Sequence, residues 1–257
     1  MLYVAGVVWL HSAAWGVVLG FAGLFAAALP LNLWTRKRLE KGFSAVQEYL
    51  AETQGVLRRK MQMLQNKMGG GGKGLQRKIE KEQAEAVHKA LEMLDSLKPL
   101  YKWSVLAERQ VNTLRAQLHY QLKEFEDADR CLKKCLIMDP TTLAMRMARD
   151  YAHGEWKKLE KAFKRGVKRY KDEKGVILYA LYSWILVKEG RIDEAVQVLD
   201  KGKEETENEV LRSNWEHLVN GRTRHFSNAG LGETWYALML ETPKPVKVRQ
   251  RRGRIRR

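Results

Sequence analysis

The feature that most constrains this chain is an apolar N-terminal run, with no Asp, Glu, Lys or Arg from Met1 to Trp34. Only three side chains in residues 2–33 are strongly polar, namely His11, Ser12 and Asn32. The run exceeds the roughly 20 apolar residues with which a helix crosses a hydrocarbon core of about 30 Å. Trp15 and Trp34 flank residues 16–33, as expected if their indole rings lie at the two head-group layers. The sequence therefore predicts a single transmembrane anchor over residues 1–34.

Basic residues follow the apolar run directly, at Arg36, Lys37, Arg38 and Lys41. Signal peptides place positive charge before their apolar run, so this order disfavours a cleaved signal peptide. Basic residues next to a span stay on the cytoplasmic side of the membrane. We therefore expect a single-pass membrane protein with a cytoplasmic C-terminal domain. Its membrane interface is predicted to be formed by these four cations together with the two tryptophans.

The net charge of +17 does not follow from folding needs, because any core can be surrounded by balanced charge. It indicates a polyanionic neighbour, and anionic lipid, nucleic acid and an acidic partner protein all fit. The two cysteines, Cys131 and Cys135, are too few for a secreted disulfide scaffold, and their spacing places them on one helix face. A reducing compartment fits this cysteine usage best.

Residues 35–98 show two apolar stripes at helical spacing, separated by a glycine-rich run at 69–74. Successive glycines have too much backbone entropy to remain helical, so the run is expected to be a flexible turn. It lacks the residue order of a nucleotide phosphate loop, which also requires a preceding strand. We therefore expect a basic amphipathic helical hairpin over residues 35–98.

Residues 99–241 are predicted to form helices of about a dozen residues separated by short turns, with no sustained alternation typical of strands. Three stretches, residues 123–140, 153–166 and 188–202, resemble the second half of a tetratricopeptide repeat. Leu159 is a departure, because it stands where the family has a small residue. The matching positions, where repeat packing is expected, are Phe125, Ala128, Leu132, Cys135, Pro140, Gly154, Trp156, Phe163, Gly190, Ala195, Leu199 and Gly202.

The resemblance implies a tetratricopeptide-like α-solenoid with degenerate repeats and capping helices. Together with the predicted anchor and hairpin, it makes the expected fold class all-α. It also implies a concave groove that binds peptides or proteins. Paired helices that contact only their neighbours form extended grooves and no deep catalytic pocket. We therefore expect a membrane-anchored interaction scaffold or adaptor that is not an enzyme. An enzyme with an unrecognised site is the weakest hypothesis.

Residues 242–257 form a basic tail that is expected to be disordered, because its charges repel one another. Its eight cations are Lys244, Lys247, Arg249, Arg251, Arg252, Arg254, Arg256 and Arg257. Near an anionic leaflet each such charge contributes about 1 kcal/mol, which favours lipid association of the basic flanks. The alternative is a membrane-associated nucleic-acid-binding protein that uses the tail, although no stacking-aromatic or helix-turn-helix signature supports it.

No residue is predicted to be catalytic, metal-ligating or cofactor-binding. Cys131, Cys135 and the neighbouring His119 are residue types that bind zinc, but the paired C-x-x-C knuckles of zinc sites are missing. Cys135 also falls where the repeat has a small buried residue, so packing explains it. No local signature of a nucleophile with its base occurs in the chain.

Overall fold

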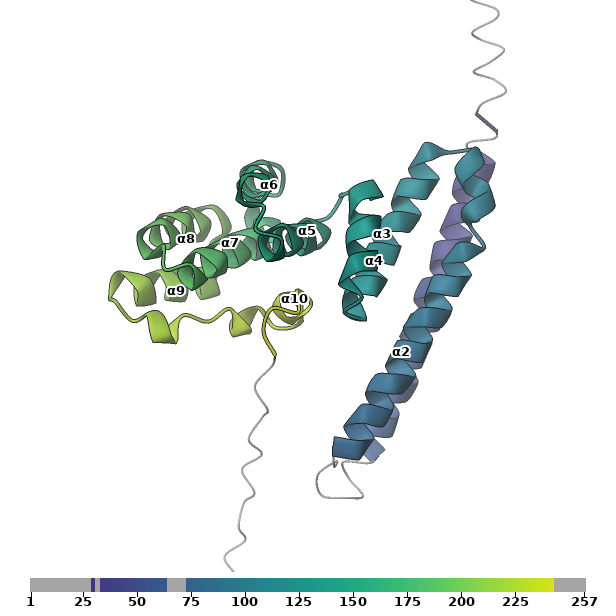
Figure 1. Ribbon diagram of the computed structural model, residues 1–257, viewed down its shortest axis with the longest axis horizontal. Coiled ribbons are helices and arrows are strands. Elements are labelled where there is room, and N and C mark those ends of the chain that lie inside the picture. The colour runs from purple at the N-terminus through teal and green to yellow at the C-terminus, as the bar shows by residue number, and fades with distance from the viewer. Residues whose placement is uncertain (1–28, 31–32, 64–72, 243–257) are drawn as a thin grey trace, which may run out of the picture. The chain divides into compact units, whose positions relative to one another are not determined.

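A computed structural model describes residues 29–30, 33–63 and 73–242, and every regular element in these ranges is helical (Figure 1). The prediction of an all-α chain is therefore confirmed for this part of the sequence. The chain divides into two compact units, Met1–Leu136 and Ile137–Arg257, which are described separately. The glycine-rich turn predicted at 69–74 lies outside the described residues as far as residue 72.

Among the residues that the structure describes from 33 onward, unit 1 has three longer helices and two short ones. The first runs over residues 33–63 and lies beside the second, α2, in Figure 1. Lys60 Nζ of the first helix donates to Glu82 Oε2 of α2 over 2.7 Å. The elements that follow the first helix are α2 (Lys73–Asp95), the 3-10 helix η1 (Lys98–Lys102), α3 (Val105–Gln121) and α4 (Phe125–Lys134).

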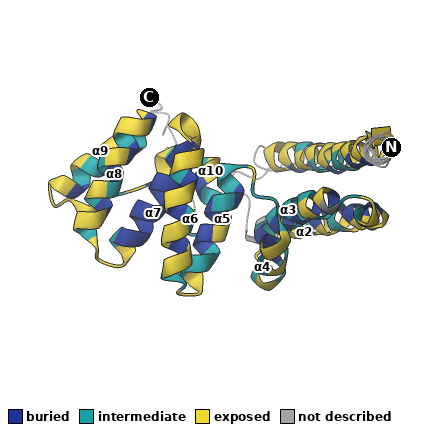
Figure 2. Cartoon of the chain, turned by 90° about the horizontal axis from the view of Figure 1, so that it is seen from above, coloured by how far each residue is buried: buried dark blue, intermediate teal, exposed yellow. Residues whose placement is uncertain are grey.

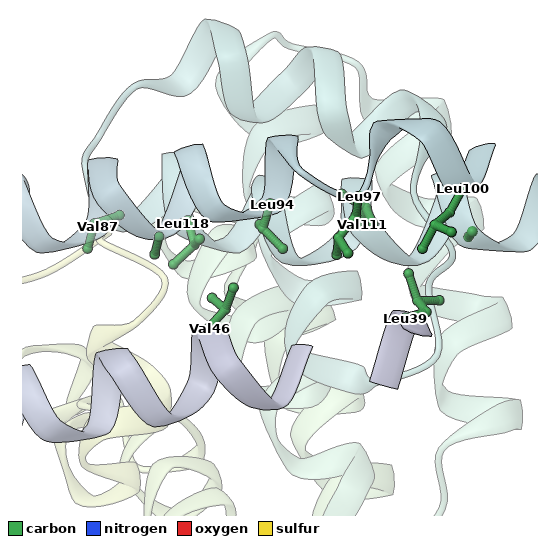
Figure 3. Packing of buried hydrophobic residues seen from close by; sticks show 10 residues of the cluster. Leu39, Val46, Val87, Leu94, Leu97, Leu100, Val111 and Leu118 are labelled. Carbon is green, nitrogen blue, oxygen red and sulfur yellow. The ribbon is translucent and has the colours of Figure 1, made fainter. Parts of the chain in front are cut away.

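The core of unit 1 joins the first helix to α2, η1 and α3 (Figure 3). Leu39 and Val46 of the first helix are buried together with Leu94 and Leu97. Each fully buried side chain of this size contributes about 1.5–3 kcal/mol. Gly42 permits the close approach, because a Cβ atom there would lie only 2.5 Å from Leu97 Cδ2. The apolar stripes of the sequence therefore face one another in this unit.

Unit 2 continues with successive helix pairs. Its most apolar helix is α7, in which every residue from Val176 to Leu186 is buried, and Figure 2 shows it in dark blue. A helix that is apolar all round belongs inside a protein, and α7 contacts α5, α6, α8 and α9. The elements are α5 (Pro140–Ala152), α6 (Trp156–Arg169), η2 (Asp172–Gly175), α7 (Val176–Lys188), α8 (Ile192–Thr206), α9 (Glu209–Val219), η3 (Thr223–His225), η4 (Ala229–Leu231) and α10 (Glu233–Tyr236).

Polar side chains define where several of these helices begin. Asp139 caps α5 by accepting a hydrogen bond from the Thr142 backbone N–H over 2.7 Å. Asn208 caps α9 in the same way, and Ser104 caps α3. Such caps satisfy backbone donors that the first helical turn cannot pair internally. The turn signals in the sequence therefore correspond to physical helix boundaries.

The segment after α9 is held against α7 by buried polar contacts. Asn228 is fully buried, and its Nδ2 donates to the Ala180 carbonyl oxygen of α7 over 2.9 Å. Its Oδ1 accepts from Asn214 Nδ2 of α9 over 2.8 Å. Buried amides are tolerated only when they are paired, so these bonds fix the position of the segment. Trp235 of α10 is also fully buried.

The predicted localisation as a single-pass membrane protein is wrong. Within residues 29–30, 33–63 and 73–242, no helix combines the length and the apolar character that a membrane span requires. The long helices of unit 1 carry charges along their length, and the strongly apolar α7 has only 13 residues. Most of the predicted anchor, residues 1–28 and 31–32 with Trp15, lies outside the described residues.

Candidate protein-binding surface

A groove of about 480 Å³ lies between α5 and α6 in unit 2. Its lining combines basic side chains with an apolar floor and a single acid, and we call it the basic groove. The lining residues are Ile137, Leu143, Arg146, Asp150, Lys158, Lys161, Ala162, Arg165, Gly166, Arg169 and Tyr170.

The local sequence brings the two walls of the basic groove together. Gly154, with φ of +70°, forms the tight turn between α5 and α6, a conformation that glycine adopts without a steric penalty. Gly166 is buried where α6 crosses its neighbours. A Cβ atom at this position would lie 2.7 Å from Leu143 Cδ2 and 2.8 Å from Leu178 Cδ1. The close approach of α6 to α5 and α7 therefore depends on the missing side chain.

The charge in the basic groove is strongly one-sided, with five basic side chains against Asp150. Lys158 pairs with Glu155 over 2.7 Å, and Arg169 Nη1 donates to the Ile137 carbonyl oxygen over 3.2 Å. Lys161 and Arg165 are exposed and make no ion pair with a carboxylate of the described residues. Burial raises the pKa of Asp150, the one acid of this lining.

Leu143 and Ala162 are the half-buried apolar part of the lining, called the floor here, and the exposed Lys161 and Arg165 form its rim. Tyr170 also lines the basic groove, and its side chain is buried. The Tyr170 hydroxyl has no hydrogen-bond partner within the described part of the chain. Burial raises the pKa of this hydroxyl, so it stays protonated and keeps its capacity to donate. The arrangement can therefore hold an anionic group at the rim and an apolar group on the floor.

A second hollow, of about 400 Å³, lies on the other side of α6 and is bordered by α7 and α8. Phe163 stacks on Tyr182 there, with ring centroids 4.1 Å apart. The Tyr179 hydroxyl donates to Glu205 over 2.7 Å. Three lysines and three glutamates line this hollow, so it lacks the one-sided charge of the basic groove.

The residues predicted to pack the repeats lie in both units. In unit 1, Ala128 and Leu132 are buried, and Phe125 meets Tyr120 edge to face at 5.3 Å. In unit 2, Pro140 is in the first turn of α5. Trp156 begins α6 and meets Tyr151 edge to face at 5.7 Å. Of the other predicted positions there, Phe163, Ala195, Leu199 and Gly202 are buried, whereas Gly154 and Gly190 are exposed in turns. Leu159, the departure from the repeat pattern, is buried as well.

The cysteines and the residues predicted at a membrane interface do not line the basic groove. Cys135 Sγ donates to the Leu132 carbonyl oxygen over 3.2 Å at the end of α4, and burial raises the pKa of Cys131. Trp34 is exposed, and the Arg38 guanidinium lies 6.0 Å from its ring centroid. Arg36, Lys37 and Lys41 are likewise exposed. The cations of the predicted tail lie outside the described residues.

Comparison with known protein families gives a match in the region of α3 and α4. Residues 110–142 match the tetratricopeptide repeat family. The resemblance to this superfamily is therefore confirmed for one repeat, and repeats of this kind generally mediate the binding of protein partners. No curated protein and no solved structure matches the chain.

The basic groove was missed by the sequence analysis, which placed the polyanion-binding charge in the tail. The composition of α6 does indicate a basic surface, because its 14 residues include seven Lys or Arg and one Glu. Periodicity alone does not reveal which of these cations share a cavity with residues of α5. That information comes from the packing of the two helices.

Proposed function

We propose that this chain is a protein-interaction adaptor that binds acidic segments of partner proteins in the basic groove. The observation that carries the proposal is the set of five basic side chains around an apolar floor, with Lys161 and Arg165 free of ion pairs to described carboxylates. The tetratricopeptide match over residues 110–142 supports a role in binding proteins. It does not by itself select a ligand, because function belongs to sites and not to folds.

The chemistry of the groove selects a segment that carries both acidic and apolar side chains. Lys161 and Arg165 would meet carboxylates at the rim, where charge accelerates association and rejects basic competitors. Leu143 and Ala162 would receive an apolar side chain, and such desolvated contacts supply most binding energy in protein interfaces.

The test is fluorescence anisotropy of the full chain with a labelled peptide of Glu, Asp and Leu residues. Lys161→Glu/Arg165→Glu should weaken binding by about tenfold or more, because two attractive contacts become repulsive. The matched control is Lys171→Glu/Lys174→Glu, which makes the same change of charge at exposed positions outside the groove. The control should bind within about twofold of the unaltered protein, since exposed charges that do not line the groove are screened by solvent and salt.

Two results would contradict the proposal. Equal losses in both variants would show that binding follows net charge and not the groove. Tighter binding of a single-stranded RNA with the same number of charges, at physiological ionic strength, would favour a nucleic-acid partner. A peptide in which Gln and Asn replace the acids should not bind, because it lacks the charges that the rim recognises.

A further inference from the structure

Two imidazoles and two carboxylates from three elements of unit 1 meet beside a cavity of about 740 Å³. His119 lies in the last turn of α3, and its Nδ1 is 2.8 Å from Glu124 Oε2. His88 of α2 approaches the other oxygen, with its Nε2 3.5 Å from Glu124 Oε1. Asp127 lies in the first turn of α4. The Glu124 carboxylate thus stands between two imidazoles that belong to different helices.

Three of these groups, His119, Glu124 and Asp127, come close to the spacing that a small divalent cation requires. One ligand atom each of His119, Glu124 and Asp127 lies within 4.8 Å of the other two. Tetrahedral zinc, with bonds of about 2.0–2.2 Å, places its ligand atoms roughly 3.3–3.6 Å apart. Glu124 and Asp127 have side-chain exposures of 34% and 42%, so rotation about their side-chain bonds can close the difference.

The mixture of donors also indicates which cation fits. Imidazole nitrogen suits zinc and its transition-metal neighbours, whereas calcium and magnesium prefer sites made of oxygen alone. The two carboxylates supply negative charge that two neutral imidazoles lack. Asp127 now pairs with Arg130, whose side chain is 75% exposed. A pair this open to solvent is weak, so a divalent cation can displace the guanidinium.

From this geometry we propose that His119, Glu124 and Asp127 form a zinc-binding site, and that His88 orients Glu124 from outside the ligand set. His119 belongs to α3, Asp127 to α4 and His88 to α2, so a bound ion would join α3 to α4 and, through Glu124 and His88, would link this helix pair to the long helix α2. Binding would therefore stabilise unit 1 and would leave the basic groove of unit 2 chemically unchanged. This site is independent of the proposed binding of acidic segments.

The test is titration calorimetry of the full chain with Zn²⁺ in a buffer that does not coordinate metals. We expect one ion per chain and a higher unfolding temperature with zinc, because a ligand that binds only the folded state stabilises it. His119→Gln should weaken binding by about 100-fold or more, and His88→Gln by about tenfold, by analogy with the loss of inner and outer metal contacts. Co²⁺ in place of Zn²⁺ should give visible d–d bands without a thiolate charge-transfer band.

Matched variants make the outcome decisive. His153→Gln alters an exposed histidine of unit 2 and should leave the affinity unchanged. Cys131→Ser should also leave it unchanged, and a loss of binding in that variant would overturn the assignment in favour of a thiolate site. If His119→Gln lowers the unfolding temperature without zinc, Asp127→Asn provides the second test. Zinc binding that survives both His119→Gln and Asp127→Asn would overturn the proposal.

Discussion

The indole rings of Trp184 and Trp235 meet edge to face, with centroids 5.9 Å apart, and both donate to the same carboxylate. Trp184 Nε1 donates to Glu241 Oε1 and Trp235 Nε1 to Glu241 Oε2, each over 2.8 Å. Trp184 belongs to α7 and Trp235 to α10. Glu241 therefore ties the end of the described chain to the central helix of unit 2.

Glu241→Gln should lower the free energy of unfolding by about 1–3 kcal/mol, because the amide offers one acceptor oxygen and leaves one indole N–H without a partner. Urea denaturation followed by tryptophan fluorescence measures the change. Glu204→Gln is the control, since Glu204 is exposed on α8. An equal effect of the two substitutions would show that the shared carboxylate does not hold this segment.

Replacing glycine with alanine should have opposite effects on stability at Gly166 and at Gly55. Gly166→Ala should destabilise the protein by about 1–3 kcal/mol, because the new methyl group would meet Leu143 and Leu178 at van der Waals overlap. Gly55→Ala, in the helix over residues 33–63, has nothing within 4 Å of the added atom. It should stabilise the helix by about 0.5–1 kcal/mol. Thermal unfolding followed by circular dichroism compares the two, and shifts in the same direction would contradict the packing at Gly166.

Asn228→Ala should cost about 2–4 kcal/mol. The substitution removes a fully buried amide and leaves both Asn214 Nδ2 and the Ala180 carbonyl oxygen without these partners. Guanidinium denaturation measures the loss. Asn220→Ala, at an exposed position after α9, serves as the control and should change stability by no more than about 0.5 kcal/mol. A small effect at Asn228 would mean that the segment is held mainly by Trp235.

Features that depend on interactions between residues close in the sequence could be predicted, and features that depend on contacts between distant residues could not. The all-α fold and the turn glycines depend on local periodicity and on backbone freedom, and both can be read within a dozen residues. The basic groove depends on how closely α6 approaches α5, and that distance is set by Gly166 against Leu143 and Leu178. The juxtaposition of His88 with Glu124 joins residues far apart in the sequence. Local sequence patterns do not predict such contacts.

The membrane prediction failed for a related reason. Hydropathy and flanking charge suggested a span over residues 16–33, most of which lie outside the described residues. Among the described residues, the most apolar helix is α7, and α5, α6, α8 and α9 cover it instead of lipid. Apolar surface is satisfied by either environment, so composition alone does not distinguish them.

Asp150→Asn should increase both stability and affinity for acidic peptides at neutral pH. Burial raises the pKa of Asp150 above its usual value of 3.8, and Arg146 offsets this only in part. The folded state therefore favours the protonated carboxyl group, and ionisation at higher pH lowers the stability of the fold. The gain from Asn should shrink as the pH falls from the raised pKa of the folded state toward 3.8. It should vanish below 3.8, where the carboxyl group is protonated in both states. Denaturation across this pH range, with exposed Glu216→Gln as the control, measures the effect. The substitution also removes the only acid from the basic groove, so tighter peptide binding without a gain in stability would contradict the effect of burial.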